Sequence, residues 1–157
     1  MPSGTGLPED WMGRTELTRA IINKDTPLAL KLLERCGDPN HTDNAGCSDL
    51  YFAAAYSEPE VLRELLRKGA DPDGRHGRML PLLGALDSVQ QYMHQTEFDA
   101  YGQAFEMVKA LLEAGADPDL SQSGMATIRQ NAKYLAPGPI AEYMKTCPKR
   151  NPREEGV

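Results

Sequence analysis

The sequence predicts an all-α protein built from repeated helix-turn-helix units that are joined by short hairpin-like turns. Three nearly identical phrases support this: "LLERCGDPN" at 32–40, "LLRKGADPD" at 65–73 and "LLEAGADPD" at 111–119. Apolar residues precede each phrase at helical spacing. The Asp-Pro pair near the end of each phrase prevents the helix from continuing and begins a turn. Repetition of this kind is typical of units that stack on one another.

The repeat keeps a constant spacing along most of the chain. Asp71 follows Asp38 at the same interval at which Gly46 follows Gly13. This interval gives a period of about 33 residues, within the range of stacking repeats. The interval from Asp71 to Asp117 is longer, so one copy carries an insertion of about 13 residues.

The first helix of each unit is expected to follow a capping residue. Thr15 in "TELTRA" and Ser48 in "SDLYFA" have side-chain oxygens that can accept hydrogen bonds from N–H groups of the first turn. The third unit, "LPLLGA", lacks such a cap, but Pro81 suits a helix start because its missing N–H costs little there.

The second helix of each unit carries an apolar stripe that contains paired leucines, at 32–33, 65–66 and 111–112. Gly69 and Gly115 follow where a left-handed C-cap is expected, and Cys36 replaces this glycine in the first unit.

These signals divide the chain into a flexible N-terminus, a repeat domain and a disordered tail. The expected ranges are 1–9, 10–147 and 148–157. Within the domain we expect units one to four at 10–42, 43–74, 75–120 (with the insertion near 88–103) and 121–147.

Unit two, "DNAGCSDLYFAAAYSEPEVLRELLRKGADPD", resembles the ankyrin repeat over its whole length. The resemblance covers about residues 10–145, is interrupted in unit three, and is partial in unit four, which looks like a terminal cap. It implies an all-α ankyrin-repeat solenoid that binds proteins. The histidine of the family's T-P-L-H motif is absent, and the stack is expected to be less rigid for that reason; the residues in its place are Thr18, Tyr51, Leu83 and Arg129.

Charge and composition exclude several classes of partner. The net charge of −6 argues against a nucleic acid or an anionic membrane and favours a basic protein. No apolar run is long enough to span a membrane, and the N-terminus does not resemble a secretory signal. The three cysteines, Cys36, Cys47 and Cys147, form no CxxC pair and are expected to be free thiols in the cytoplasm.

The insertion in unit three is the largest difference between the copies. It is expected to lengthen both helices of that unit. Residues 79–108 contain four acids and no Lys or Arg, with aromatic residues between them. Such a mixture is typical of a protein-binding surface. The candidate contact residues are Asp87, Tyr92, Glu97, Asp99 and Tyr101; alternatively, Phe98, Phe105 and Tyr101 pack the longer helices together.

Two further regions contribute candidates. The resemblance implies a groove lined by turns and first helices, where Asp49, Phe52 and Tyr56 would be presented beside Arg19 and Asn23. Phe52 and Tyr56 are one helical turn apart and share a helix face, although Phe52 could instead pack between units.

Trp11, the single tryptophan, either contacts the partner or covers the open end of the stack. Arg75 and His76 lie in the turn "DGRHGR". This turn is interpreted as solvated and balancing nearby aspartates, in preference to a phosphate site.

Nothing in the chain has the pattern of a catalytic, cofactor or metal site. His41, His76 and His94 lack metal-ligand spacing, and the "DPD" carboxylates recur with the repeat, as turn-forming residues do. Phosphate-binding glycine motifs and the nucleophile motif G-x-S-x-G are absent.

We therefore expect a non-catalytic module without cofactor or metal, monomeric when free, that binds a protein partner. A stoichiometric inhibitor, such as an immunity protein that neutralises a toxin, is the favoured interpretation. For a nuclease or another basic enzyme, the acidic insertion would mimic the anionic substrate. The alternatives are an adaptor that joins two partners and, from another class, a small-ligand-binding protein or enzyme.

Overall fold

The computed structural model describes residues 8–35, 38–74, 77–92, 98–121, 126–135 and 138–148. Within these ranges the chain is all-helical, which confirms the predicted class. The helices are α1 (Glu16–Ile22), α2 (Thr26–Leu33), α3 (Asp49–Ala55), α4 (Pro59–Arg67), α5 (Pro81–Tyr92), α6 (Phe98–Glu113), α7 (Ile128–Leu135) and α8 (Pro139–Thr146). Extended pairing is limited, in the described part, to two isolated bridges, Glu9–Thr15 and Thr42–Ser48.

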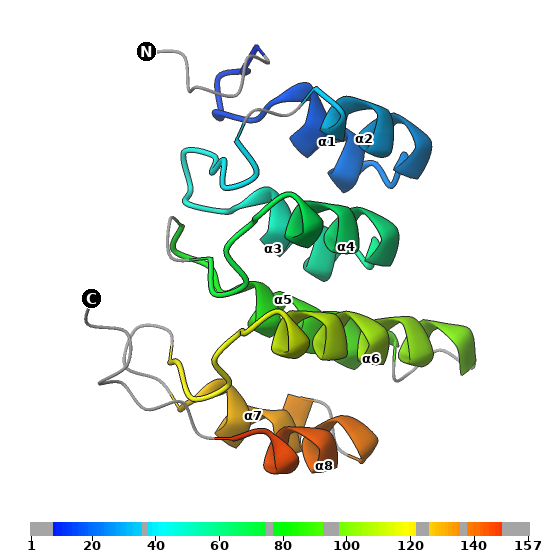
Figure 1. Ribbon diagram of the computed structural model, residues 1–157, viewed down its shortest axis with the longest axis vertical. Coiled ribbons are helices and arrows are strands. Elements are labelled where there is room, and N and C mark those ends of the chain that lie inside the picture. Colours follow the sequence, from blue (N-terminus) through cyan, green and yellow to red (C-terminus); the bar gives the residue numbers. More distant parts are fainter. Residues whose placement is uncertain are drawn as a thin grey trace.

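The helices form antiparallel pairs that stack along the long axis of the molecule, with the turns between successive pairs on one side (Figure 1). Helices α1, α3, α5 and α7 contact one another in that order and form the first-helix layer. Helices α2, α4 and α6 form a second layer in the same way, and α8 packs on α7 at the C-terminal end. None of the helices in the described ranges combines the length and apolar character that crossing a membrane requires.

The helix caps follow the expectations from the sequence. The side chains of Thr15 and Ser48 accept hydrogen bonds from the N–H groups of Thr18 and Tyr51. Helix α5 begins at Pro81. Gly69 and Gly115 have φ values of 96° and 104°, in the region that favours glycine, as a C-cap there requires.

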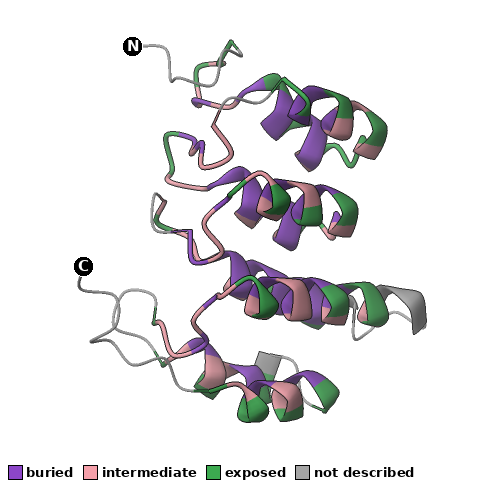
Figure 2. Ribbon diagram, in the orientation of Figure 1, coloured by how far each residue is buried: buried purple, intermediate pink, exposed green. Residues whose placement is uncertain are grey.

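The core runs without a break between successive pairs (Figure 2). Each first helix buries one aliphatic side chain near its start: Leu17, Leu50, Leu82 and Ile128. The second helices bury leucines of the repeated phrase, among them Leu33, Leu65 and Leu111. One helix pair has too little apolar surface to fold alone, so stacking supplies the core.

The repeated aspartates form the joints between units. In the first joint, Asn40 Oδ1 accepts a hydrogen bond from the N–H of Asp71 at 2.7 Å. In the second, Asp73 Oδ1 accepts one from the N–H of Asp117, also at 2.7 Å. Asp38, Asp71 and Asp117 each bond the N–H of the next residue but one, which confirms the interpretation of these carboxylates as turn-forming.

The insertion lengthens both helices of its unit, as expected. Helices α5 and α6 have 12 and 16 residues, whereas α3 and α4 have 7 and 9. The side chains of residues 91–100 lie outside the described part of the structure. The flexibility expected of the N-terminus and of the tail stays a prediction, because residues 1–7 and 149–157 also lie outside it, as do Cys36 and Gly37.

Candidate partner-binding surface

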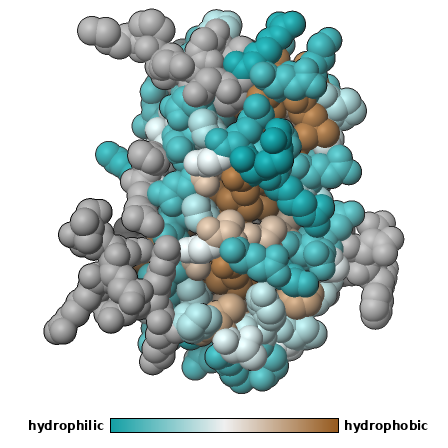
Figure 3. Space-filling view, in the orientation of Figure 1, coloured by the Kyte–Doolittle hydropathy of each residue, from teal (hydrophilic) through white to brown (hydrophobic). Residues whose placement is uncertain are grey.

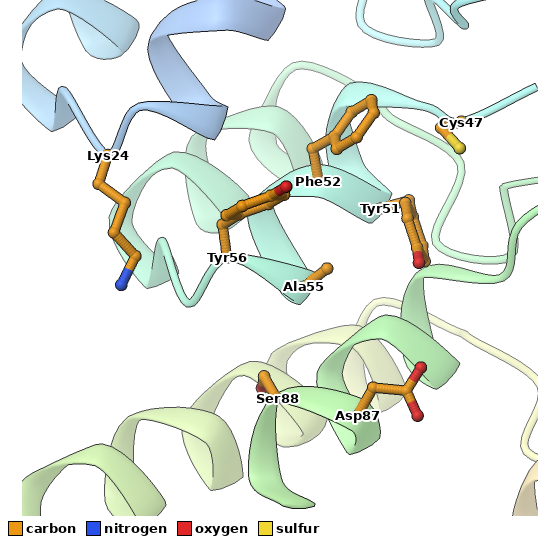
Figure 4. A pocket seen from close by; sticks show the side chains of 8 residues that line it. All are labelled: Lys24, Cys47, Tyr51, Phe52, Ala55, Tyr56, Asp87 and Ser88. Atoms are coloured by element: carbon orange, nitrogen blue, oxygen red, sulfur yellow. The ribbon is translucent and has the colours of Figure 1, made fainter. Parts of the chain in front are cut away.

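A pocket of about 590 Å³ opens between α3 and α5 on the first-helix layer (Figure 4). Three aromatic side chains line it: Tyr51, Phe52 and Tyr56. Lys24 contributes from the turn between α1 and α2, and Asp87 contributes from α5. The pocket thus combines aromatic rings with charged groups of both signs.

Tyr56 is the exposed aromatic of this pocket. It caps the C-terminus of α3, where the chain turns away from the core, and 39% of its surface is exposed. Its ring centroid lies 6.3 Å from that of Phe52, so the two side chains share a helix face, as their spacing predicted. A role of Tyr56 in partner binding stays a prediction.

The expectation that Phe52 is exposed was wrong, because only 5% of this residue is accessible. The guanidinium of Arg14, from the preceding unit, lies over the ring at 5.4 Å from its centroid. Tyr51 packs edge-on against the same ring at 5.8 Å. Phe52 therefore packs between units, which was the alternative, and forms part of the pocket wall.

The placement of Asp49 on the groove surface was also wrong, since this residue is 2% exposed. Its carboxylate accepts a hydrogen bond of 2.7 Å from the Thr18 hydroxyl of the preceding unit. Burial raises the pKa of Asp49 from 3.8 to about 6, against the opposing effect of the Thr18 hydrogen bond. Asp49 belongs to the contact between units and is shielded from a partner.

Asp87 is exposed at the edge of the pocket, as expected. Partial desolvation raises the pKa of its carboxyl group. No cation among the described side chains lies within ion-pair distance of it. Asp87 is thus a carboxylate at the edge of an aromatic pocket, and the cation of the same pocket, Lys24, is outside ion-pair distance of it.

Cys47 also lines the pocket, and its thiol is half-buried. Burial and the nearby carboxylate of Asp43 raise the pKa of this thiol. A raised pKa lowers the thiolate fraction at neutral pH, which disfavours nucleophilic chemistry at this position.

Trp11 and Tyr134 are the most exposed large apolar side chains of the described residues, at 86% and 71%. An indole this exposed buries little of its surface against the stack, so the end-covering alternative for Trp11 was wrong. Its carbonyl accepts a hydrogen bond from Asn44 at 3.1 Å, which fixes the turn that presents it. Tyr134 was not identified from the sequence as an exposed aromatic. The available signal was its place on the polar side of α7, beside Lys133 and one helical turn after Gln130.

The described part of the insertion contributes mainly to packing. Tyr101 is half-buried and packs against the core. Phe105 meets Tyr143 of α8 edge-on, with centroids 5.8 Å apart, in support of the alternative in which aromatics of the insertion pack. The other candidates cannot be placed in the same way: Arg75, His76 and Glu97 lie outside the described residues, as do the side chains of Tyr92 and Asp99.

A second pocket, of about 520 Å³, lies between α4 and α6 on the second layer. Pro59, Arg63 and Phe105 line it, and Arg63 forms an ion pair of 3.8 Å with Glu106. The face seen in Figure 3 is mostly hydrophilic and has separate apolar patches in place of one continuous strip.

No group of three or more His, Cys, Asp and Glu side chains is arranged to hold a metal ion in the ranges that the structure covers. His41 is buried and its Nε2 lies 2.8 Å from the carbonyl oxygen of Gly13, a contact between the two ends of unit one.

No protein-family model matches the chain.

Proposed function

We propose that the chain is an ankyrin-like repeat protein and a non-catalytic module that binds a protein partner. This proposal depends on the difference between residues that recur in every unit and residues that vary from unit to unit. The aspartates that form the turns recur from one unit to the next, whereas the exposed residues of the first-helix layer differ. Arg19, Tyr56, Asp87 and Tyr134 are accessible on successive first helices and have different chemistry. Recognition of a specific partner requires exposed residues of different chemistry, whereas the stacking of units does not require them.

The ankyrin-like assignment is supported by hydrogen bonds that recur at the repeat period. Asp10 Oδ1 accepts from the N–H groups of Met12 and Arg14 at 2.9 and 3.0 Å. Asp43, at the equivalent position of the next unit, accepts in the same way from Ala45 and Cys47 at 3.0 and 2.9 Å. Equivalent turns therefore precede equivalent helices, which supports a solenoid built from one kind of unit.

The acidic charge of the chain favours a basic partner, which the chain would inhibit by covering part of its surface. The chain has a net charge of −6, and residues 79–108 contain acids without Lys or Arg. A module without a reaction centre acts by covering a surface of its partner. A stoichiometric inhibitor fits these properties, for example an immunity protein that covers the active site of a basic toxin and takes the place of its anionic substrate.

The experiment is capture of partners with the tagged chain, followed by titration of the purified partner's own activity. We expect one dominant basic partner, released as salt rises and silenced at one equivalent of the chain. Replacing Asp87, Glu97 and Asp99 by Lys should weaken binding at low salt by about tenfold or more, because like charges then face each other. Replacing Glu34 and Glu113, exposed acids of the second layer outside both pockets, by Lys is the control.

Unchanged affinity of the triple variant at low salt would exclude the insertion as a steering surface. An adaptor is the second candidate, and the pocket between α4 and α6 favours it because it offers a separate surface. Two partners bound at once to one chain would support the adaptor. A single partner that protects both surfaces from hydrogen exchange would exclude it.

A further inference from the structure

We infer that a small polar pocket at the start of α4 receives the ammonium group of a lysine side chain of the basic partner. The pocket has a volume of about 210 Å³ and lies where the start of α4 meets the start of α2 and the side of α6. The residues that line it are Thr26, Ser57, Glu58, Pro59, Glu60 and Gln103. This inference rests on the proposed protein-binding function and adds a contact site of stated chemistry on the second layer.

The first argument is a buried carboxylate without a counter-charge. Glu58 is 6% exposed, and its Oε2 accepts a hydrogen bond of 2.5 Å from the Thr26 hydroxyl. No Lys, Arg or His of the described residues forms an ion pair with Glu58 or lines this pocket. Burial of a carboxylate is costly unless the charge is paired, so a cation gains more here than at an open surface.

The second, independent argument is the hydroxyl group of Ser57. Within the described ranges, its oxygen is the one buried side-chain polar atom without a hydrogen-bond partner. Ser57 lines the pocket and directly precedes Glu58 in the chain. A buried hydroxyl group without a partner is unfavourable, and a donor placed in the pocket beside Glu58 would satisfy it.

The polar groups of the pocket fit an ammonium group better than a guanidinium. They offer oxygen acceptors: two carboxylates, two hydroxyls and one side-chain amide. An ammonium group has three donors around a compact charge, whereas a guanidinium fork uses both oxygens of one carboxylate. Because Thr26 already occupies Oε2 of Glu58, a compact donor that uses Oε1 fits best. Pro59 borders both this pocket and the pocket between α4 and α6, so its ring offers an apolar contact to the lysine stem.

Two positive features lie near the pocket, and neither opposes this placement. The start of α4 carries the partial positive charge of a helix N-terminus, which the carboxylates of Glu58 and Glu60 outweigh. Arg63 lines the neighbouring pocket, pairs there with Glu106 at 3.8 Å, and does not line the polar one. The polar pocket is therefore acidic on balance.

The test is an NMR titration of the isotopically labelled full chain with three small probes at matched ionic strength. N-acetyl-lysine amide carries the ammonium group, its Nε-acetylated form lacks the charge, and N-acetyl-arginine amide carries a guanidinium. We expect the lysine probe to cause saturable shifts in the amide signals of Ser57, Glu58 and Glu60, and the other two probes to cause clearly smaller ones. Glu58→Gln should weaken lysine binding by about tenfold, because a charge-assisted hydrogen bond is lost.

Matched variants separate the pocket from general charge. Ser57→Ala should weaken lysine binding by about threefold, the loss of one hydrogen bond. Glu34→Gln removes an exposed acid of the second layer that lines neither pocket there, and it should leave lysine binding unchanged. Equal responses to the three probes, shifts that map elsewhere on the chain, or no shift at all would overturn the inference. Binding of calcium ions in place of the lysine probe would also overturn it, since the oxygen groups would then serve a metal.

The outcome for the pocket is separable from the outcome for the function. Lysine binding that depends on Glu58, in a chain for which no protein partner is found, would support the pocket and reject the proposed function. A purified partner that binds the wild-type chain and Glu58→Gln equally, together with no response to the lysine probe, would reject the pocket and retain the function.

Discussion

At the scale of single residues, neighbours decide which side chains are buried. Glu16 and Asp49 occupy the same position of successive units, at the start of α1 and of α3. Glu16 is exposed, whereas Asp49 is covered because Thr18 of the preceding unit lies against it. In the described part of the chain no helix pair precedes α1, so Glu16 has no such cover.

Burial of Asp49 makes the stability of the fold depend on pH. The folded protein has a raised pKa for this group, about 6 against 3.8, so it binds the proton more tightly than the unfolded chain does. The resulting stabilisation is complete below pH 3.8 and is lost as the pH rises through 6. Asp49→Asn should therefore raise the free energy of unfolding at pH 7.5, by up to about 3 kcal/mol, and have little effect near pH 4. Urea unfolding at both pH values measures this difference.

Glu16→Gln provides the matched control, since it removes a carboxylate at the equivalent but exposed position. It should change stability little at either pH, apart from a small loss of favourable interaction with the helix N-terminus. A wild-type protein more stable than Asp49→Asn at pH 7.5 would mean that the charged Asp49 stabilises the joint.

The same effect explains which predictions from the sequence succeeded. The period, the caps at Thr15 and Ser48 and the lengthened helices of unit three were predictable, because they depend on local residue patterns. The exposure of Asp49 and Phe52 was mispredicted, because it depends on Thr18 and Arg14 of the unit before. The spacing of residues along one helix shows which side chains share a face, but it does not show which residues of the neighbouring unit cover that face.

At the scale of elements, α5 and α6 each contain a glycine within the helix, and the two have opposite surroundings. Gly102 of α6 is exposed, and a Cβ there would meet no atom within 4 Å. Gly84 of α5 is buried, and a Cβ there would lie 3.0 Å from the ring of Tyr51 and 3.3 Å from its carbonyl oxygen. The absence of a side chain at Gly84 lets α5 approach α3 closely, which brings Asp87 to the pocket.

We expect opposite effects from the same substitution at these positions. Gly102→Ala should stabilise the protein by about 0.5–1 kcal/mol, because alanine loses less backbone entropy in a helix. Gly84→Ala should destabilise it by about 1 kcal/mol or more, because the new methyl group pushes α5 from Tyr51. Thermal and urea unfolding of both variants measures this contrast. A stabilising Gly84→Ala would show that the two helices have room to separate.

At the scale of the whole molecule, hydrogen bonds and ion pairs connect each unit to the next. The last joint differs from the others, because Arg129 stands where the ankyrin pattern has histidine. Its guanidinium pairs with Asp119 through contacts of 2.8 and 3.0 Å and donates to the carbonyl groups of Met144 and Cys147. Arg129 thus joins α7 and α8 to unit three. The lower rigidity expected of the stack stays a prediction.

The losses of unfolding free energy caused by substitutions at the first and the last joint should be additive. Asn40→Ala removes an acceptor of the first joint and should cost about 1–2 kcal/mol, and Arg129→Ala should cost about 2–3 kcal/mol at the last. The double variant should lose the sum of the two within about 0.5 kcal/mol, because the sites share no contact. Urea unfolding of the four proteins gives the coupling energy. A coupling above about 1 kcal/mol would contradict transmission through neighbouring units only.

The joints also bear on how such a chain can change in length. Asn40 and Asp73 present the same kind of oxygen to the same backbone N–H of the following unit, at the same distance of 2.7 Å. A copy of residues 41–73 placed directly after the original would find a matching acceptor before it and a matching donor after it. Duplication or loss of a whole unit therefore preserves this hydrogen bond of the joint. An insertion such as that of unit three is accommodated at the far end of a helix pair, where α5 and α6 are lengthened.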